Sequence, residues 1–169
     1  MRAANPLKNF LTKTPVLWIL AVVMILIGMS FGYVSQVYEI NLLDEISDPE
    51  RVRSSIAAMS EEQKRVHLWT TGVLDVAFPL AYGGLFVGLA WRFLGAAGPL
   101  LALPGLAVIP IDLTEGVVQI MALGGNNDVV VHKAWVTPLK FGLFLPASLI
   151  ALFALGLAVR RKFFGRASA

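Results

Sequence analysis

Residues 111–119 decide the fold, and they read Ile-Asp-Leu-Thr-Glu-Gly-Val-Val-Gln in the middle of a long apolar segment. On an α-helix, Asp112, Glu115 and Gln119 stand at positions i, i+3 and i+7, so their side chains project from one face. Ionisable side chains at membrane depth cost a few kcal/mol each and normally face a bundle interior or a wet cavity. This stretch therefore predicts a helix that turns a polar stripe towards partner helices.

The composition indicates a membrane protein. Apolar residues make up 57% of the 169 residues and charged residues 15%, against about 45–50% and 25% in soluble proteins. The mean hydropathy is +0.72. Cysteine is absent, which excludes disulfides, thiolate metal sites and thiol chemistry.

Four long apolar segments predict four transmembrane helices, because each is long enough to cross about 30 Å of hydrocarbon. We expect a single domain, residues 1–169, with spans at about residues 15–35, 66–93, 100–123 and 137–159. The predicted fold is an all-α polytopic membrane four-helix bundle. The first segment follows a basic start, as in a signal peptide, but it is longer than an ordinary h-region and no A-x-A-like site follows. We therefore expect it to be retained.

Local signals refine the second and third spans. Residues 60–63, Ser-Glu-Glu-Gln, match a capping box, so the second helix should begin in water near Glu61. Gly84 and Gly88 form a small-xxx-small pair that permits close helix approach. Pro104 and Pro110 lie inside the third span, and each should bend the helix by removing a backbone donor.

The segment between the first two spans is polar and predicts a helical loop outside the cytoplasm. Asp48-Pro49 is typical of an N-cap followed by proline at the first helical position. Val52, Ile56 and Met59 then form a narrow apolar stripe. The short helix could lie on the bilayer or cap the bundle mouth, or it could be a solvated loop helix.

The distribution of charge predicts the orientation. The side that holds both termini carries eight basic residues and no acid: Arg2, Lys8, Lys13, Arg92, Arg160, Arg161, Lys162 and Arg166. The other side carries eight acids and five basic residues, the latter being Arg51, Arg53, Lys64, Arg65 and Lys133. The positive-inside rule then places both termini in the cytoplasm, with the protein integral to the plasma (inner) membrane.

Four ionisable residues remain inside apolar segments: Asp75, Asp112, Glu115 and Lys140. Their depths are compatible with one cluster in the outer half of the bundle. Tyr82 shares a helix face with Asp75, and Gln119 shares the face of Glu115, so both are candidate ligand- or ion-binding residues as well. Lys140 could snorkel outwards or bend inwards to a carboxylate. Three carboxylates and one ammonium sum to −2 if all are ionised, so we expect a proton or a cation to compensate.

Other site chemistry is weakly represented. His67 and His132 are expected near the outer surface, and no metal-ligating histidine spacing exists, so we expect neither metal nor cofactor. The four tryptophans are interpreted as interface anchors. The basic residues flank apolar segments, which excludes nucleic-acid binding. The expected partners are the lipid bilayer, a lipid-like or cationic ligand, and a second copy of the chain or another membrane protein.

The Asp-x-x-Glu pattern of Asp112-Leu113-Thr114-Glu115, in the third span of a compact four-helix chain, resembles small bacterial integral membrane proteins of uncharacterised function. That resemblance implies a four-helix membrane bundle and no particular activity. The layout is also similar, more weakly, to the EXPERA group, which includes sterol isomerases and a sigma-2-type receptor. Those proteins bury carboxylates around a lipid-like amine or sterol. No EXPERA motif aligns with this sequence, so no residue role is carried over.

Three functions compete at this level. The buried cluster could be structural in a partner-binding membrane protein, which ranks first. It could bind or transport protons, cations or an amphipathic cationic ligand. It could also serve a lipid-modifying enzyme in which Glu115 or Asp112 is a general acid or base.

Overall fold

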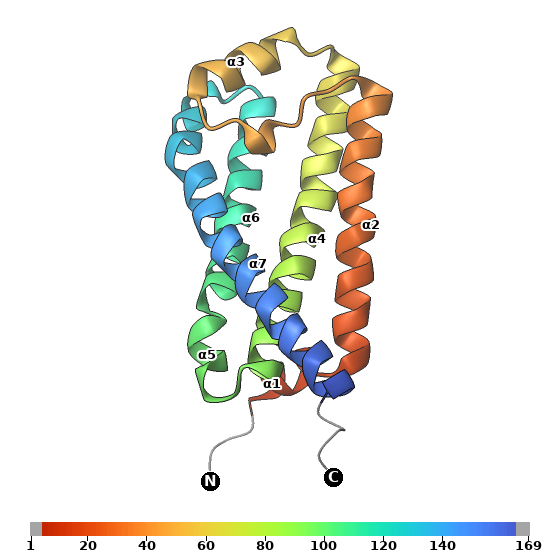
Figure 1. The fold of residues 1–169 in the computed structure, drawn as a ribbon. Coiled ribbons are helices and arrows are strands. Elements are labelled where there is room, and N and C mark those ends of the chain that lie inside the picture. Colours follow the sequence, from red (N-terminus) through yellow and green to blue (C-terminus); the bar gives the residue numbers. More distant parts are fainter. Residues whose placement is uncertain (1–4, 165–169) are drawn as a thin grey trace.

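The computed structural model describes residues 5–164, which are 89% helical and contain no strand (Figure 1). Within residues 5–164, seven α-helices follow one another: α1 Pro6–Leu11, α2 Thr14–Tyr38, α3 Pro49–Ala58, α4 Glu61–Phe93, α5 Gly98–Leu101, α6 Leu103–Leu123 and α7 Lys133–Phe164. Short 3-10 turns lie at Leu43–Glu45, Gly95–Ala97 and Asn127–His132. The predicted all-α class is confirmed for the described residues.

Four helical segments are long and apolar enough to cross a membrane, as predicted: Thr14–Tyr38, Glu61–Phe93, Gly95–Leu123 and Asn127–Phe163. Their bounds differ from the prediction. The first runs past residue 35 to Tyr38, where Glu39 ends it in the left-handed conformation (φ 52°). The last of the four long helices, α7, begins at Lys133 and not at residue 137. Lys133 therefore belongs to the helix and not to the loop.

The third span is broken near its start, which corrects the prediction of two prolines inside one helix. α5 ends at Leu101 and α6 begins at Leu103, so Pro104 occupies the first turn of α6, where its missing N–H costs no helical bond. Pro110 does lie inside α6. Pro110 is therefore the proline that removes a backbone donor from the interior of α6 just before Asp112.

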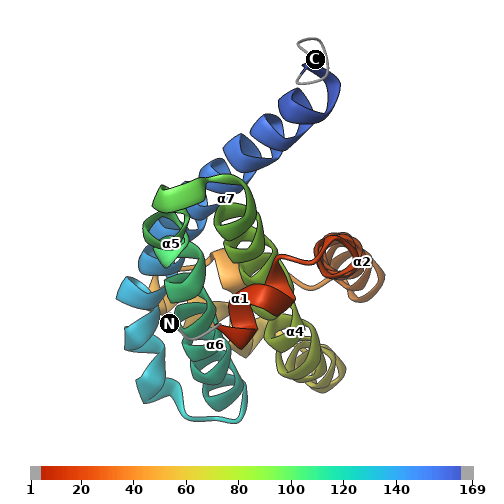
Figure 2. The same cartoon turned by 90° about the horizontal axis from the view of Figure 1, so that it is seen from below.

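α4 is the central helix, and α2, α6 and α7 pack against it (Figures 1 and 2). A Cβ atom at Gly88 would lie 2.5 Å from the Leu11 carbonyl oxygen and 2.7 Å from a Leu17 methyl group. The close approach predicted for the small-xxx-small pair is thus present, and it lets α1 and α2 pack directly against α4. Figure 2 shows α2 set apart from α6 and α7, on the opposite side of α4.

The end of the molecule opposite α1 and α5 is covered by α3 (Figure 1). The predicted caps are confirmed, since Asp48 accepts a hydrogen bond from the Glu50 N–H at 2.9 Å and Ser60 forms a capping box with Gln63. Val52 and Ile56 are buried and pack in one apolar cluster with residues at the C-terminal end of α6. The short helix is therefore a cap on the helix ends and not a solvated loop helix.

Residues 39–48, here called the strap, run from α2 to α3 across the same end. Leu43 of the strap is fully buried in the cluster beneath α3. The Ser35 hydroxyl donates to the Ile40 carbonyl oxygen at 2.7 Å, and the Gln63 amide donates to the Tyr38 carbonyl oxygen at 3.0 Å. These contacts hold the strap against the long helices.

Candidate functional site

The polar stripe of α6 faces the interior, as its spacing predicts. Glu115 and Gln119 are fully buried and Asp112 is 9% exposed. α4, α7 and the strap supply the groups that meet this stripe.

Glu115 is surrounded by donors from α7. Its Oε1 atom accepts hydrogen bonds from Lys133 Nζ, at 2.7 Å, and from the Thr137 hydroxyl. Its Oε2 atom forms an ion pair with Lys140 Nζ. Two ammonium groups and a hydroxyl therefore compensate one buried carboxylate.

Lys133, Thr137 and Lys140 are spaced i, i+4 and i+7 and form a stripe on α7 that complements the stripe on α6. From the sequence, Lys133 is expected among the loop charges of the outer side, but its side chain is only 1% exposed and belongs to the buried network. The seven-residue spacing between the two lysines was the signal that could have found it. Lys140 bends inwards, so the snorkelling alternative is also excluded.

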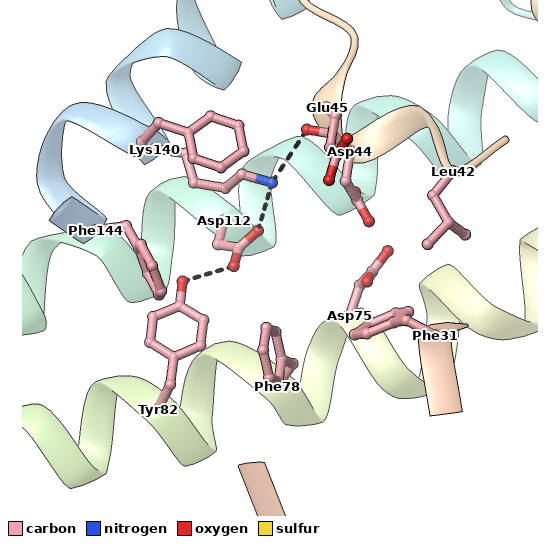
Figure 3. Close-up of a pocket in the computed structure, with 11 residues that line it drawn as sticks. Phe31, Leu42, Asp44, Glu45, Asp75, Phe78, Tyr82, Asp112, Lys140 and Phe144 are labelled. Carbon is pink, nitrogen blue, oxygen red and sulfur yellow. Dashed lines mark hydrogen bonds and ion pairs between the residues drawn. The ribbon is translucent and has the colours of Figure 1, made fainter. Parts of the chain in front are cut away.

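Asp112 links α6 to α4. Its Oδ2 atom accepts a hydrogen bond from the Tyr82 hydroxyl at 2.7 Å, and its Oδ1 atom lies 3.5 Å from Lys140 Nζ (Figure 3). The structure therefore brings Tyr82, Asp112, Glu115 and Lys140 together, in keeping with their predicted depths.

The strap adds groups that, from the sequence, are expected only in the polar loop between the first two spans. The Asp44 carboxylate accepts a hydrogen bond from the Gln119 amide, and the Asp44 carbonyl oxygen lies 3.4 Å from Lys140 Nζ. Lys133 Nζ also donates to the Leu43 carbonyl oxygen at 2.7 Å. Asp44 joins the site because the strap folds back over the helix ends, an arrangement that no local pattern encodes.

A cavity of about 220 Å³ opens beside this network. Its walls combine charged groups with aromatic rings from α2, α4 and α7, and Figure 3 shows them around one space. The Tyr82 ring meets the rings of Phe78 and Phe144 edge to face, with both centroid distances at 5.1 Å. The full lining is Phe31, Leu42, Asp44, Glu45, Asp75, Phe78, Tyr82, Asp112, Lys140, Phe141 and Phe144.

Asp75 is the least paired acid of the site. It is 8% exposed, it lines the cavity, and its carboxylate points across it towards Asp44 (Figure 3). Among residues 5–164, no basic side chain forms an ion pair with Asp75. Asp75 therefore lies close to the predicted cluster but outside its network of ion pairs.

The polar interior continues above Asp75 along α4. His67 and Thr71, at i−8 and i−4, are each 1% exposed, so both side chains are buried inside the protein. α3 and the strap cover this end of α4, which explains the burial. His67 Nδ1, Thr71 Oγ1 and Gln119 Oε1 have no hydrogen-bond partner among the described residues.

Apolar packing closes the interior below Tyr82. The cluster there contains buried residues of α2, α4, α6 and α7, among them Leu89, Val108, Ala151 and Ala154. The polar interior is therefore confined to the half of the molecule under the strap.

The charge balance differs in its members from the predicted one but not in its sum. Four carboxylates (Asp44, Asp75, Asp112 and Glu115) face two ammonium groups (Lys133 and Lys140), which leaves a formal charge of −2 if all are ionised. Glu45 also lines the cavity, from an exposed position. Most of the uncompensated charge lies around the cavity, because Glu115 faces both lysines.

Comparisons of the chain with protein-family models, curated proteins and solved structures found no match. The candidate site therefore rests on the geometry of its own residues. The similarity of the Asp112–Glu115 pattern to small bacterial membrane proteins stays a prediction.

Proposed function

We propose that the chain is an integral membrane protein of the plasma (inner) membrane, with both termini in the cytoplasm. The four long apolar helices support this proposal. α2 carries large apolar side chains on its outward surface, including Trp18, Ile25 and Met29 at 56–69% exposure, as lipid-facing helices do. Among the described residues, the end with α1 and α5 carries basic side chains and no acid, whereas the other end carries acids on the strap, on α3 and at the start of α4 together with some basic residues.

Within that membrane protein, the cavity beside Asp75 is proposed to bind an organic cation that has an apolar part, such as a substituted ammonium. One observation carries the proposal: Asp75 is a buried acid without a basic partner in the described chain, and it faces a cavity walled by aromatic rings. A carboxylate attracts the cation by charge, and aromatic faces attract it through their quadrupoles. The ligand would also compensate part of the formal charge of −2.

The proposed ligand reaches the site from the strap side. A second hollow, lined by Phe31, Leu42, Glu45 and Arg51 among others, adjoins the cavity and shares three lining residues with it. Apolar packing closes the other end. This arrangement favours a binding protein with one-sided access over an open pore.

The test measures binding of benzyltrimethylammonium to the purified full-length protein in detergent. Its uncharged analogue, neopentylbenzene, has nearly the same shape and serves as the ligand control. We expect the cation to bind and the analogue to bind at least about tenfold more weakly, which corresponds to roughly 1.4 kcal/mol. Asp75→Asn should weaken cation binding by a similar factor, whereas Glu61→Gln, at an exposed helix start, should leave it unchanged. Equal binding of both probes, or full binding by Asp75→Asn, contradicts the proposal.

A structural role is the second candidate, and the pairing of Glu115 favours it. Two lysines and Thr137 compensate this carboxylate, and both lysines also hold the strap through its carbonyl oxygens. Such a network fixes helix rotation and strap position without any ligand. If neither probe binds to the wild type or to Asp75→Asn, the structural role is supported. Partner binding would then occur elsewhere on the surface.

A further inference from the structure

An apolar groove lies at the opposite end of the molecule from the strap. It has a volume of about 260 Å³ and runs between α2, α4 and α7. Its walls are almost entirely apolar and include Leu17, Trp18, Leu85, Leu89 and Leu155. Trp18 is 69% exposed, so the groove opens on the outward surface of α2.

The polar end of this groove is basic. Arg92 lines it from the last turn of α4, and its guanidinium donates to the Thr12 carbonyl oxygen at 2.9 Å. This bond positions the side chain and leaves other N–H donors available. Thr14 lines the groove as the first residue of α2, a helix whose first turn has neither a side-chain cap nor an acid. The helix dipole adds positive potential at that point.

Further basic residues around this end of the groove add to its positive charge. The described residues at this end include six basic side chains and no acid: Lys8, Lys13, Arg92, Arg160, Arg161 and Lys162. The Arg92 guanidinium therefore lies at one end of the apolar groove, which follows α2 from Thr14 to Ala21. An anionic phospholipid is complementary to both parts, since its phosphate meets Arg92 and its acyl chain follows the groove.

We propose that this groove is a binding site for an anionic phospholipid of the leaflet nearest α1 and α5. The proposal rests on the membrane placement of the protein but not on the cation site, which lies in the other half of the molecule. Arg92 and Thr14 bind the phosphate, and the groove wall formed by Leu85, Leu89 and Leu155 holds an acyl chain.

The test uses tryptophan fluorescence, because Trp18 lines the groove. Replacing Trp69, Trp91 and Trp135 with Phe leaves Trp18 as the reporter. The full-length chain is reconstituted in phosphatidylcholine vesicles that contain phosphatidylglycerol or phosphatidylcholine brominated on the acyl chains. At equal mole fraction, we expect brominated phosphatidylglycerol to quench Trp18 about fivefold more effectively, the factor that one basic residue near an anionic lipid provides.

Three further variants separate the contributions of charge and shape. Arg92→Gln should bring the quenching ratio close to one, and Arg92→Lys should keep part of the preference because it keeps the charge. Ala21→Phe fills the groove and should also remove the preference, which covers the case in which Arg92→Gln does not fold. Arg161→Gln, outside the groove, and Asp75→Asn, in the other half, should keep the wild-type ratio.

Three results overturn the proposal. The first is equal quenching by the two brominated lipids in the wild-type background. The second is an unchanged preference in folded Arg92→Gln together with Ala21→Phe. The third is loss of the preference when millimolar inorganic phosphate is added, because the site would then bind free phosphate and not a lipid. None of these results bears on benzyltrimethylammonium binding, so failure here is distinguishable from failure of the cation site.

Discussion

Glu115 and Asp75 are both buried carboxylates in the same half of one helical molecule, yet their surroundings are opposite. Glu115 is in contact with Lys133, Lys140 and Thr137. Asp75 faces a cavity and forms no ion pair with the described residues. The comparison separates a carboxylate that the fold has already compensated from one that a ligand could compensate.

The difference matters because burial of charge costs several kcal/mol per ion unless partners compensate it. At Glu115 the partners are built in, so the group belongs to the architecture. At Asp75 the cost remains, and natural proteins commonly keep such unfavourable groups where function needs them. Four substitutions test this contrast by their effect on the free energy of unfolding in detergent.

The largest effect is expected for Glu115→Gln. Removal of the carboxylate takes from Lys133 its ion-pair partner and leaves Lys140 with Asp112, which should cost about 3–5 kcal/mol. Chemical denaturation followed by circular dichroism measures the change. A variant that replaces Glu115 with Leu and Lys133 with Met, and keeps Lys140 for Asp112, should recover most of the loss, because the Glu115–Lys133 pair is removed as a whole. Wild-type stability in Glu115→Gln alone would show that the network is not structural.

Lys133→Met should cost less, about 2–3 kcal/mol, because Lys140 and Thr137 still compensate Glu115 while the bond to the Leu43 carbonyl is lost. The matched control is Lys64→Met, which breaks an ion pair with Glu61 on the surface. That pair should contribute at most about 0.5 kcal/mol. Limited proteolysis should also cut the strap faster in Lys133→Met. Equal effects of the two substitutions would remove the distinction between buried and surface lysines.

Tyr82→Phe should lower stability by about 1–2 kcal/mol, because Asp112 loses a buried hydrogen bond while the aromatic packing is retained. Tyr33→Phe is the control, since Tyr33 is 68% exposed on α2. The same denaturation experiment compares the two. If Tyr82→Phe leaves the free energy of unfolding unchanged, Asp112 resembles the uncompensated Asp75 and not the compensated Glu115.

The smallest effect is expected for Asp75→Asn, within about 0.5 kcal/mol of wild type or slightly more stable, because no ion pair is broken and a buried charge is removed. Asp112→Asn should cost more, since it weakens the contact with Lys140. A loss above about 2 kcal/mol in Asp75→Asn would mean that Asp75 is as structural as Glu115, and it would end the contrast between them.

Much of the helical architecture could be predicted because its signals are local. The capping box at Ser60, the N-cap at Asp48 and the shared face of Asp112, Glu115 and Gln119 each depend on residues within about two helical turns. The position of Lys133 was missed because His132-Lys133 follows a Gly-Asn-rich loop. The prediction started the last helix at Thr137-Pro138, whereas Pro138 lies inside α7.

The site was predicted in part. Depth along each span predicted one cluster of Asp75, Asp112, Glu115 and Lys140, with Tyr82 one or two turns deeper than Asp75. In the structure these side chains meet around one network and its cavity. Asp44 and His67 could not be placed, because their burial depends on how the strap and α3 fold back over α4 and α6. That folding brings together residues as distant in sequence as Asp44 and Lys140.

The sequence alone predicts the four apolar helices, the polar face of α6 and the basic residues near the termini, because hydropathy and helical periodicity are properties of neighbouring residues. Which charges compensate one another depends instead on how distant segments pack. The rotation of α7 turns two lysines onto Glu115, and the path of the strap brings Asp44 to the cavity. Ion pairs act over a few ångströms. Packing between segments far apart in the chain decides which charged groups come that close, and it leaves Asp75 facing the cavity without an ion pair to the described residues.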